Sequence, residues 1–146
     1  MQRVHKSVLV PYSARQMFDL VDGVERYPEF LPWCGGSEVL ASRANGKTAR
    51  IDINYPGVRA HFTTDNVNEP GESITITLKD GPFRALNGTW TFRALSPQAC
   101  KVEFTLGYEF KTQVLEAVVG PVFNHIANTF IEAFVRRAEA IYGKTQ

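Results

Sequence analysis

The chain has 146 residues, of which 44% are hydrophobic and 21% are charged, a composition that is ordinary for a soluble globular protein. We expect one domain over residues 1–146 that folds without disulfides or a structural metal. Its 16 Lys and Arg residues against 15 Asp and Glu give a net charge of +1, so we expect no direct binding to DNA. The sequence shows no signal peptide and no apolar run of about 20 residues, which predicts a cytoplasmic protein.

The first thirty residues predict a strand and two short helical segments. Residues 3–10 form the expected first strand. Ser13 and Gln16 have the spacing of a capping box, and apolar residues follow at helical intervals, which predicts a helix over residues 13–21. A further helical turn is expected over residues 24–30, before the next proline stops it.

Short segments of alternating polar and apolar residues fill the middle of the chain. They are separated by turn sequences at Asn45-Gly46, Pro56-Gly57, Pro70-Gly71, Asp80-Gly81 and Ser96-Pro97. Each turn offers a residue with positive or preset φ, as a reversal between strands requires. The sequence therefore predicts an antiparallel meander with one face against the core. That face carries Tyr55, Phe62, Trp90, Phe104 and Tyr108.

The last long periodic segment predicts a helix over about residues 113–142. Gly120 and Pro121 interrupt the pattern, so we expect a kink or a restart there. One broad arc of this helix is apolar and consists of Phe123, Ile126, Ala127, Phe130, Phe134, Ala138 and Ile141. The fold class is therefore α+β, with an antiparallel sheet whose apolar face is covered by the C-terminal helix.

The aromatic inner face predicts binding more than catalysis. A helix that crosses a curved sheet can leave a gap, and an aromatic-lined gap suits a hydrophobic ligand, although the same side chains could simply fill a core. The inward positions offer Tyr55 and Tyr108 but almost no ionisable group, and no catalytic or metal-binding motif occurs. We expect no catalytic residue, metal or cofactor. A tyrosine that acts as an acid in a ketide cyclisation is the enzymatic alternative.

Arg137 is unusual because it falls inside the apolar arc of the C-terminal helix. Three interpretations stay open: its methylenes cover apolar surface, it pairs with a buried acid, or it meets the polar head of a ligand. Cys34 and Cys100 are expected to be ordinary free thiols.

The segment Val24-Glu-Arg-Tyr-Pro-Glu-Phe-Leu-Pro-Trp-Cys34 closely resembles the signature of the coenzyme Q-binding START-type family. Residues 10–18, 88–92 and 123–143 are also similar to that family, which belongs with polyketide cyclases to the helix-grip superfamily. The resemblance implies a curved antiparallel sheet of six to seven strands wrapped on a long C-terminal helix, with two short N-terminal helices and a hydrophobic tunnel.

The resemblance also implies a function, namely non-catalytic binding of ubiquinone or another polyisoprenoid lipid in support of respiration. The tunnel mouth would be formed by Tyr27, Phe30, Leu31 and Trp33, and the helix wall by Phe123, Ile126, Phe130 and Phe134. Exposed aromatic residues over 30–33 would touch the inner membrane transiently.

Two alternatives come from the same resemblance. The first is a toxin that binds the large ribosomal subunit and blocks subunit association, and the second is an aromatase/cyclase that acts on a polyketide-like substrate. Basic residues alternate with acidic residues on the expected outer face of the sheet, which favours the lipid over a ribosomal RNA surface.

Overall fold

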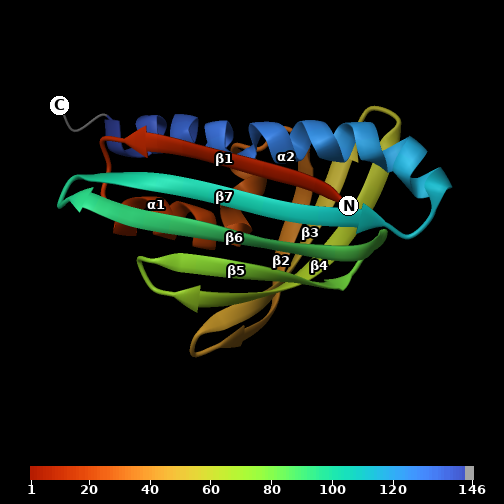
Figure 1. Ribbon diagram of the computed structural model, residues 1–146, viewed down its shortest axis with the longest axis horizontal. Coiled ribbons are helices and arrows are strands. Elements are labelled where there is room, and N and C mark those ends of the chain that lie inside the picture. The colour runs from red at the N-terminus through yellow and green to blue at the C-terminus, as the bar shows by residue number, and fades with distance from the viewer. Residues whose placement is uncertain (144–146) are drawn as a thin grey trace.

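A computed structural model describes residues 1–143 and contains one seven-stranded antiparallel sheet, with three helical segments packed against it. The elements are β1 (Gln2–Val10), α1 (Ala14–Asp22), the 3₁₀ helix η1 (Val24–Glu29), β2 (Cys34–Arg43), β3 (Gly46–Tyr55), β4 (Val58–Glu69), β5 (Ser73–Asp80), β6 (Phe83–Ser96), β7 (Ala99–Phe110) and α2 (Gln113–Tyr142). The strand order is β1-β7-β6-β5-β4-β3-β2, so β1 and β2 form the two edges (Figure 1).

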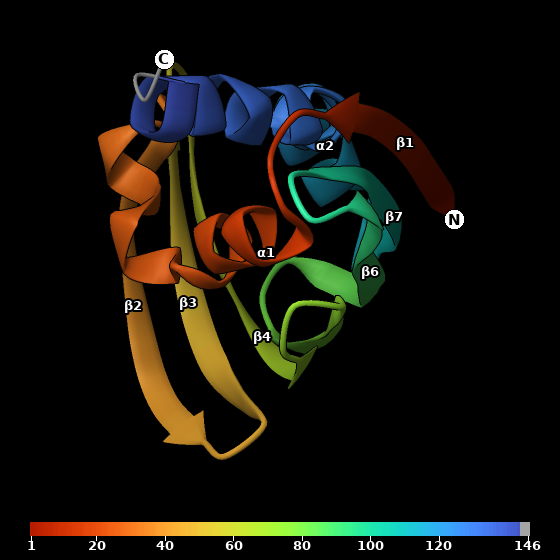
Figure 2. The ribbon, with the colours of Figure 1, turned by 90° about the vertical axis from the view of Figure 1, so that its left-hand side faces the viewer.

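The sheet curves around α2, while α1 and η1 lie across one end of the concave face (Figure 2). This arrangement confirms the predicted α+β helix-grip fold. Ser13 caps α1 as expected, because its Oγ accepts from the amide of Gln16 at 3.0 Å and Gln16 Oε1 accepts from the amide of Ser13 at 2.9 Å. A capping box satisfies amides that the first helical turn leaves unpaired, which fixes where α1 begins.

The structure contains an edge strand, β2, that the sequence analysis did not predict. Its pairing with β3 contains irregularities between Cys34 and Gly36 and between Val39 and Ala41. Each irregularity shifts the alternation by one residue, so the strand has no continuous period of two to detect.

The sequence predicts a kink or a restart at Gly120 and Pro121; the C-terminal helix α2 is continuous from Gln113 to Tyr142, so it does not restart there. The first turns, drawn in lighter blue, slope away from the axis of the rest of the helix (Figure 1), which fits a bend caused by the missing proline amide. By length and composition, α2 is the one helix within residues 1–143 that could span a membrane. Here its apolar residues instead line the concave side of the sheet, where Phe123, Ile126 and Phe134 are buried.

The core consists of apolar side chains from the concave face of the sheet and from α2. At its centre lies Trp90, whose ring centroid is 4.5 Å from that of Phe104 and 5.3 Å from that of Phe134. Tyr55 was predicted to share this face, but it is 39% exposed. It is the last residue of β3, and its ring lies near that of His125, an exposed residue of α2, so it sits at the rim of the core.

The turn sequences reverse the chain as predicted, but the glycines in two of them have different roles. Gly57 has a φ of +82°, as expected for a turn glycine. Gly46 has no positive φ and begins strand β3 directly opposite Val67. A Cβ atom at Gly46 would lie 2.0 Å from the carbonyl oxygen of Asn66. Close approach of two backbones therefore requires this glycine, and the turn conformation does not.

Candidate functional site

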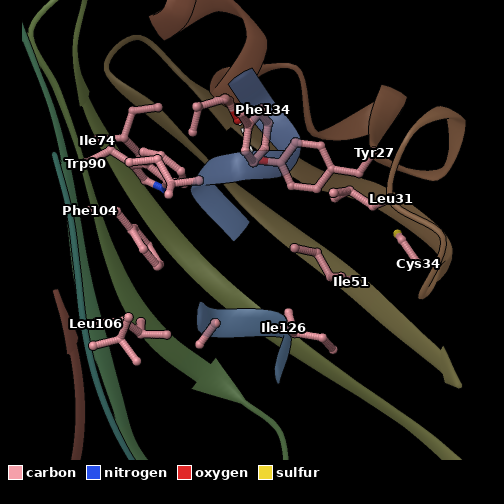
Figure 3. Packing of buried hydrophobic residues seen from close by; sticks show 14 of the residues in the cluster. Tyr27, Leu31, Cys34, Ile51, Ile74, Trp90, Phe104, Leu106, Ile126 and Phe134 are labelled. Atoms are coloured by element: carbon pink, nitrogen blue, oxygen red, sulfur yellow. Dashed lines mark hydrogen bonds between the residues drawn. The ribbon is translucent and has the colours of Figure 1, made fainter. Parts of the chain in front are cut away.

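A cavity of about 60 Å³ lies between the concave face of the sheet and α2. In Figure 3, Trp90, Phe104 and Leu106 from one side of the curved sheet face Ile51 from the other, with Ile126 of α2 beside them. Eight of the predicted ligand-binding residues line the cavity: Tyr27, Trp33, Phe62, Trp90, Phe104, Phe123, Ile126 and Phe130. Pockets for drug-sized ligands measure about 300–1,000 Å³. Aromatic rings therefore occupy most of the space that the sequence assigned to a tunnel.

The remaining predicted site residues lie elsewhere. Leu31, Tyr108 and Phe134 are buried in the core without lining the cavity, and Phe30 and Arg137 lie in a surface groove beside α1. Tyr55 lines neither of these two spaces. The structure thus divides the predicted site into a cavity wall, a packed core and an outer rim.

The loop after η1 does not expose the aromatic residues expected at a membrane-touching mouth. Trp33 is only 7% exposed, and its ring centroid lies 5.9 Å from that of Phe130. Leu31 is also buried, and Phe30 is half-buried. The prediction of an exposed loop is therefore wrong for Leu31 and Trp33, because both side chains are buried in the hydrophobic core.

Arg137 forms an ion pair with an acid that the sequence pattern does not identify. Its Nη2 lies 2.7 Å from Oε1 of Glu29, and its guanidinium carbon lies 5.0 Å from the ring centroid of Phe30. Glu29 is the last residue of η1 and is largely exposed. The contact therefore joins α2 to η1 at the surface, outside the cavity.

Tyr27 is the only titratable side chain in the wall of the cavity within the described part of the chain. Its hydroxyl donates to the carbonyl oxygen of Val21 at 2.5 Å. Burial raises the pKa of Tyr27 far above its ordinary value, and the nearby charge of Asp22 raises it further. The cavity wall thus holds no group that could exchange a proton near neutral pH.

Replacing Tyr27 with phenylalanine should reduce the fall in the free energy of unfolding at alkaline pH. Unfolded tyrosine ionises near pH 10, whereas folded Tyr27 keeps its proton, so the free energy of unfolding falls as pH rises above about 10. The slope from this one group approaches about 1.4 kcal/mol per pH unit. Urea unfolding at about pH 9 and about pH 11 measures it. An equal alkaline loss in the wild type and in Tyr27→Phe would contradict the prediction.

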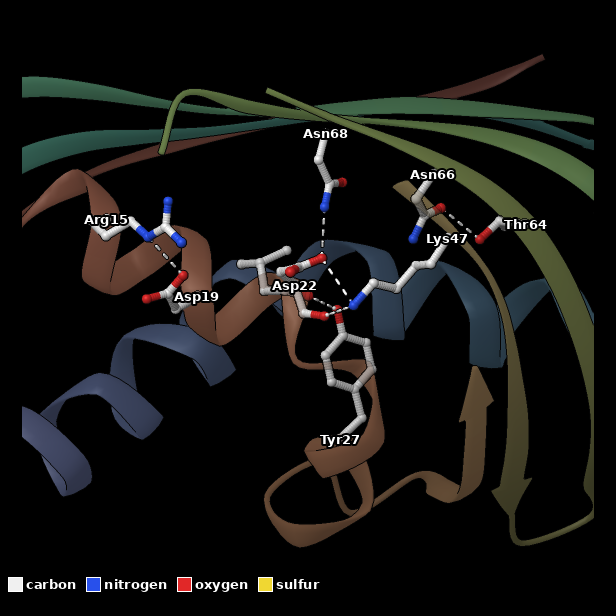
Figure 4. Close-up of polar contacts among 9 residues, drawn as sticks. Arg15, Asp19, Asp22, Tyr27, Lys47, Thr64, Asn66 and Asn68 are labelled. Carbon is white, nitrogen blue, oxygen red and sulfur yellow. Dashed lines mark hydrogen bonds and ion pairs between the residues drawn. The ribbon is translucent and has the colours of Figure 1, made fainter. Parts of the chain in front are cut away.

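A row of polar side chains lies on the concave face, and none of these residues was predicted to belong to the site. Thr64 and Asn66 of β4 line the cavity, and Thr64 Oγ1 donates to Asn66 Oδ1 at 2.9 Å (Figure 4). Further along β4, Asn68 Nδ2 donates to Oδ1 of Asp22 at 2.8 Å. Lys47 Nζ lies 3.2 Å from the same oxygen and donates to the Asp22 carbonyl at 2.9 Å.

The alternation of β4 could have revealed this row. Even-numbered residues of β4 face inward, as Phe62 does, so Thr64, Asn66 and Asn68 continue the same face. The predicted inner face of this strand extends only as far as its residues remain apolar. We name Thr64, Asn66, Asn68, Lys47 and Asp22 the polar row.

The cysteines and histidines lie outside the cavity wall. Cys34 and Cys100 are free and buried, and burial raises the pKa of each thiol, so neither is an activated nucleophile. His5 Nε2 lies 2.7 Å from Oε2 of Glu103 on the surface of the sheet. Within residues 1–143, no three His, Cys, Asp or Glu side chains come close enough together to hold a metal ion.

Comparison with known proteins places the chain in a family. The model of a family described as polyketide cyclase / dehydrase and lipid transport matches residues 10–135. The chain is 45% identical to the ribosome association toxin RatA of Vibrio cholerae, over 99% of this chain and 100% of that protein. It is 28% identical to a mitochondrial coenzyme Q-binding protein homologue of Xenopus laevis, over 97% of this chain and 59% of that protein.

Solved structures show the same fold. The Zhui aromatase/cyclase of a Streptomyces species matches with a TM-score of 0.78 at 17% identity, over 98% of both chains. A START superfamily protein from Mycobacterium smegmatis matches with a TM-score of 0.75 at 23% identity, over 95% of this chain and 98% of that one. At such identities the likeness concerns the fold alone. The sequence matches over nearly the whole chain show that it belongs to the polyketide cyclase/dehydrase and lipid transport family, in its RatA-like START-type branch.

Proposed function

We propose that this protein binds the large ribosomal subunit in the cytoplasm and blocks its association with the small subunit. The observation that carries the proposal is the 45% identity, over 99% of this chain, to a protein named for ribosome association. The likeness to the coenzyme Q-binding homologue is weaker, at 28% identity. The cavity of about 60 Å³ also favours ribosome binding over quinone binding, because a polyisoprenoid chain would have to displace several aromatic rings.

The near-neutral charge constrains how such a contact would form. A net charge of +1 supplies no strong attraction to ribosomal RNA. We therefore propose a contact in which ribosomal protein contributes a large share of the surface. Binding of this kind needs no bond to be made or broken, so the proposed role is non-catalytic.

Sedimentation of ribosomes tests the proposal directly. Purified protein is added to separated subunits before the magnesium concentration is raised, and in a parallel sample after the subunits have joined. We expect the protein to sediment with large subunits and to reduce the fraction of joined ribosomes, more strongly when it is added first. Joined ribosomes at the level of a sample without the protein, in both orders of addition, would contradict the proposal.

We propose, as a second function, that the cavity binds a hydrophobic small molecule such as a quinone or another lipid. The observation that favours it is unfilled space among closely packed rings, since protein interiors otherwise leave few voids larger than a water molecule. Lipid extraction and native mass spectrometry of the purified protein test it. A bound hydrophobic molecule is the expected result. Absence of any such molecule, together with no uptake of added quinone, would contradict it.

A further inference from the structure

The wall of the cavity contains hydrogen-bond donors that have no acceptor among residues 1–143. From them we infer that the cavity takes an apolar molecule that carries a hydrogen-bond-accepting oxygen, such as a ketone carbonyl, at the end that meets Thr64 and Asn66. This inference rests on the second proposed function, binding of a hydrophobic molecule in the cavity. It adds the chemical group by which that molecule would be recognised and the direction in which it would lie.

The pair Thr64 and Asn66 supplies the first donor. Thr64 is buried, and its Oγ1 donates to Oδ1 of Asn66 at 2.9 Å. This contact uses the oxygen of the Asn66 amide and orients the amide group. Across residues 1–143, Nδ2 of Asn66 has no acceptor within hydrogen-bond distance. The amide therefore presents an N–H group to the cavity that it lines, and an N–H group selects an acceptor.

The indole groups of Trp90 and Trp33 also offer hydrogen-bond donors to the cavity. Trp90 is 1% exposed and lines the cavity, and its Nε1–H has no hydrogen-bond acceptor in the described residues. Trp33 also lines the cavity, and no acceptor lies near its Nε1–H there either. Indole nitrogen can only donate. The hydroxyl of Tyr27 is already committed to the Val21 carbonyl, so the free polar groups of the wall are mainly donors.

The polar row fixes the orientation of such a molecule. Asn66 pairs across the sheet with Lys47 on one side and with Ile76 on the other. Lys47 and Asn68 both contact Asp22 at the end of α1 (Figure 4). The polar side of the cavity therefore faces the end of α1, and the carbonyl oxygen belongs there. The apolar body would lie toward Ile126 and the other apolar side chains of α2.

The test compares two probes that differ in one group, acetophenone and ethylbenzene, in which a methylene replaces the carbonyl. The double variant Thr64→Val/Asn66→Leu removes both polar groups together, so that neither is left buried without its partner. Asn87→Leu is the matched control, because Asn87 is an exposed residue of β6 outside the cavity. Binding is followed by nuclear magnetic resonance through the indole N–H signals and the side-chain amide signals.

We expect the double variant to bind acetophenone about fivefold more weakly than the wild type, the effect of losing one hydrogen bond. Its affinity for ethylbenzene should stay equal or rise, and Asn87→Leu should change neither affinity. In the wild type, acetophenone should also shift the Asn66 side-chain amide signal. Equal changes for the two probes in the double variant would overturn the recognition of a carbonyl while leaving cavity binding intact. Failure of the wild type to bind either probe would overturn both the inference and the second proposed function.

Discussion

Replacing Trp90 with alanine is expected to lower the free energy of unfolding by about 3–5 kcal/mol. The ring is 1% exposed and contacts the rings of Phe104, Phe130 and Phe134, with centroid distances of 4.5 to 5.7 Å. Removing it deletes these contacts and leaves a void that the hydrogen-bonded strands around it cannot fully fill. Urea unfolding followed by circular dichroism measures the loss.

The matched control for this prediction is Leu95→Ala on the same strand. Leu95 is 54% exposed, so its truncation should change stability by no more than about 0.5 kcal/mol. A loss below about 1 kcal/mol in Trp90→Ala would contradict the central position assigned to the indole. The variant also tests why the cavity is small: if aromatic rings occupy the space, Trp90→Ala should take up ethylbenzene more readily than the wild type.

The second large effect is expected for Gly46→Ala, which should cost about 3 kcal/mol or more. The new Cβ atom would lie 2.0 Å from the backbone oxygen of Asn66, so β3 and β4 would have to move apart at the position that supports the polar row. Backbone atoms of paired strands cannot yield as a flexible side chain can. Thermal unfolding measures the loss.

Gly57→Ala provides the comparison, since both glycines follow the turn pattern in the sequence. A Cβ atom added at Gly57 would meet no other atom within 4 Å, and the cost should be only the roughly 1–2 kcal/mol of a positive φ. If the two variants were equally stable, close approach would not be the reason for Gly46.

Much of the fold follows from local patterns in the sequence. The alternation over residues 100–110 predicts β7 and its buried face, and the spacing of Ser13 and Gln16 predicts the start of α1. These features depend on neighbours in the chain, so the sequence displays them. The missed strand β2 lacks such a pattern because its pairing shifts twice against β3.

The candidate site was harder to predict because it depends on contacts between distant segments. Arg137 meets Glu29, which lies 108 residues away in the chain. Asp22 holds Lys47 and Asn68 through the packing of α1 against the sheet. Periodicity assigns a side chain to a face but does not tell where that face ends, which is why Tyr55 was wrongly placed inside.

The position of β1 at the edge of the sheet has a consequence for folding. β1 pairs along its whole length with β7, so Val10 lies opposite Cys100 and Gln2 opposite Tyr108. A growing chain cannot form this pair until the seventh strand has been synthesised, and α2 follows later still. Contacts between such distant segments slow folding. During synthesis the first strand must therefore wait with an unpaired edge, and a protein proposed to act on ribosomes would acquire its complete surface only late in its own translation.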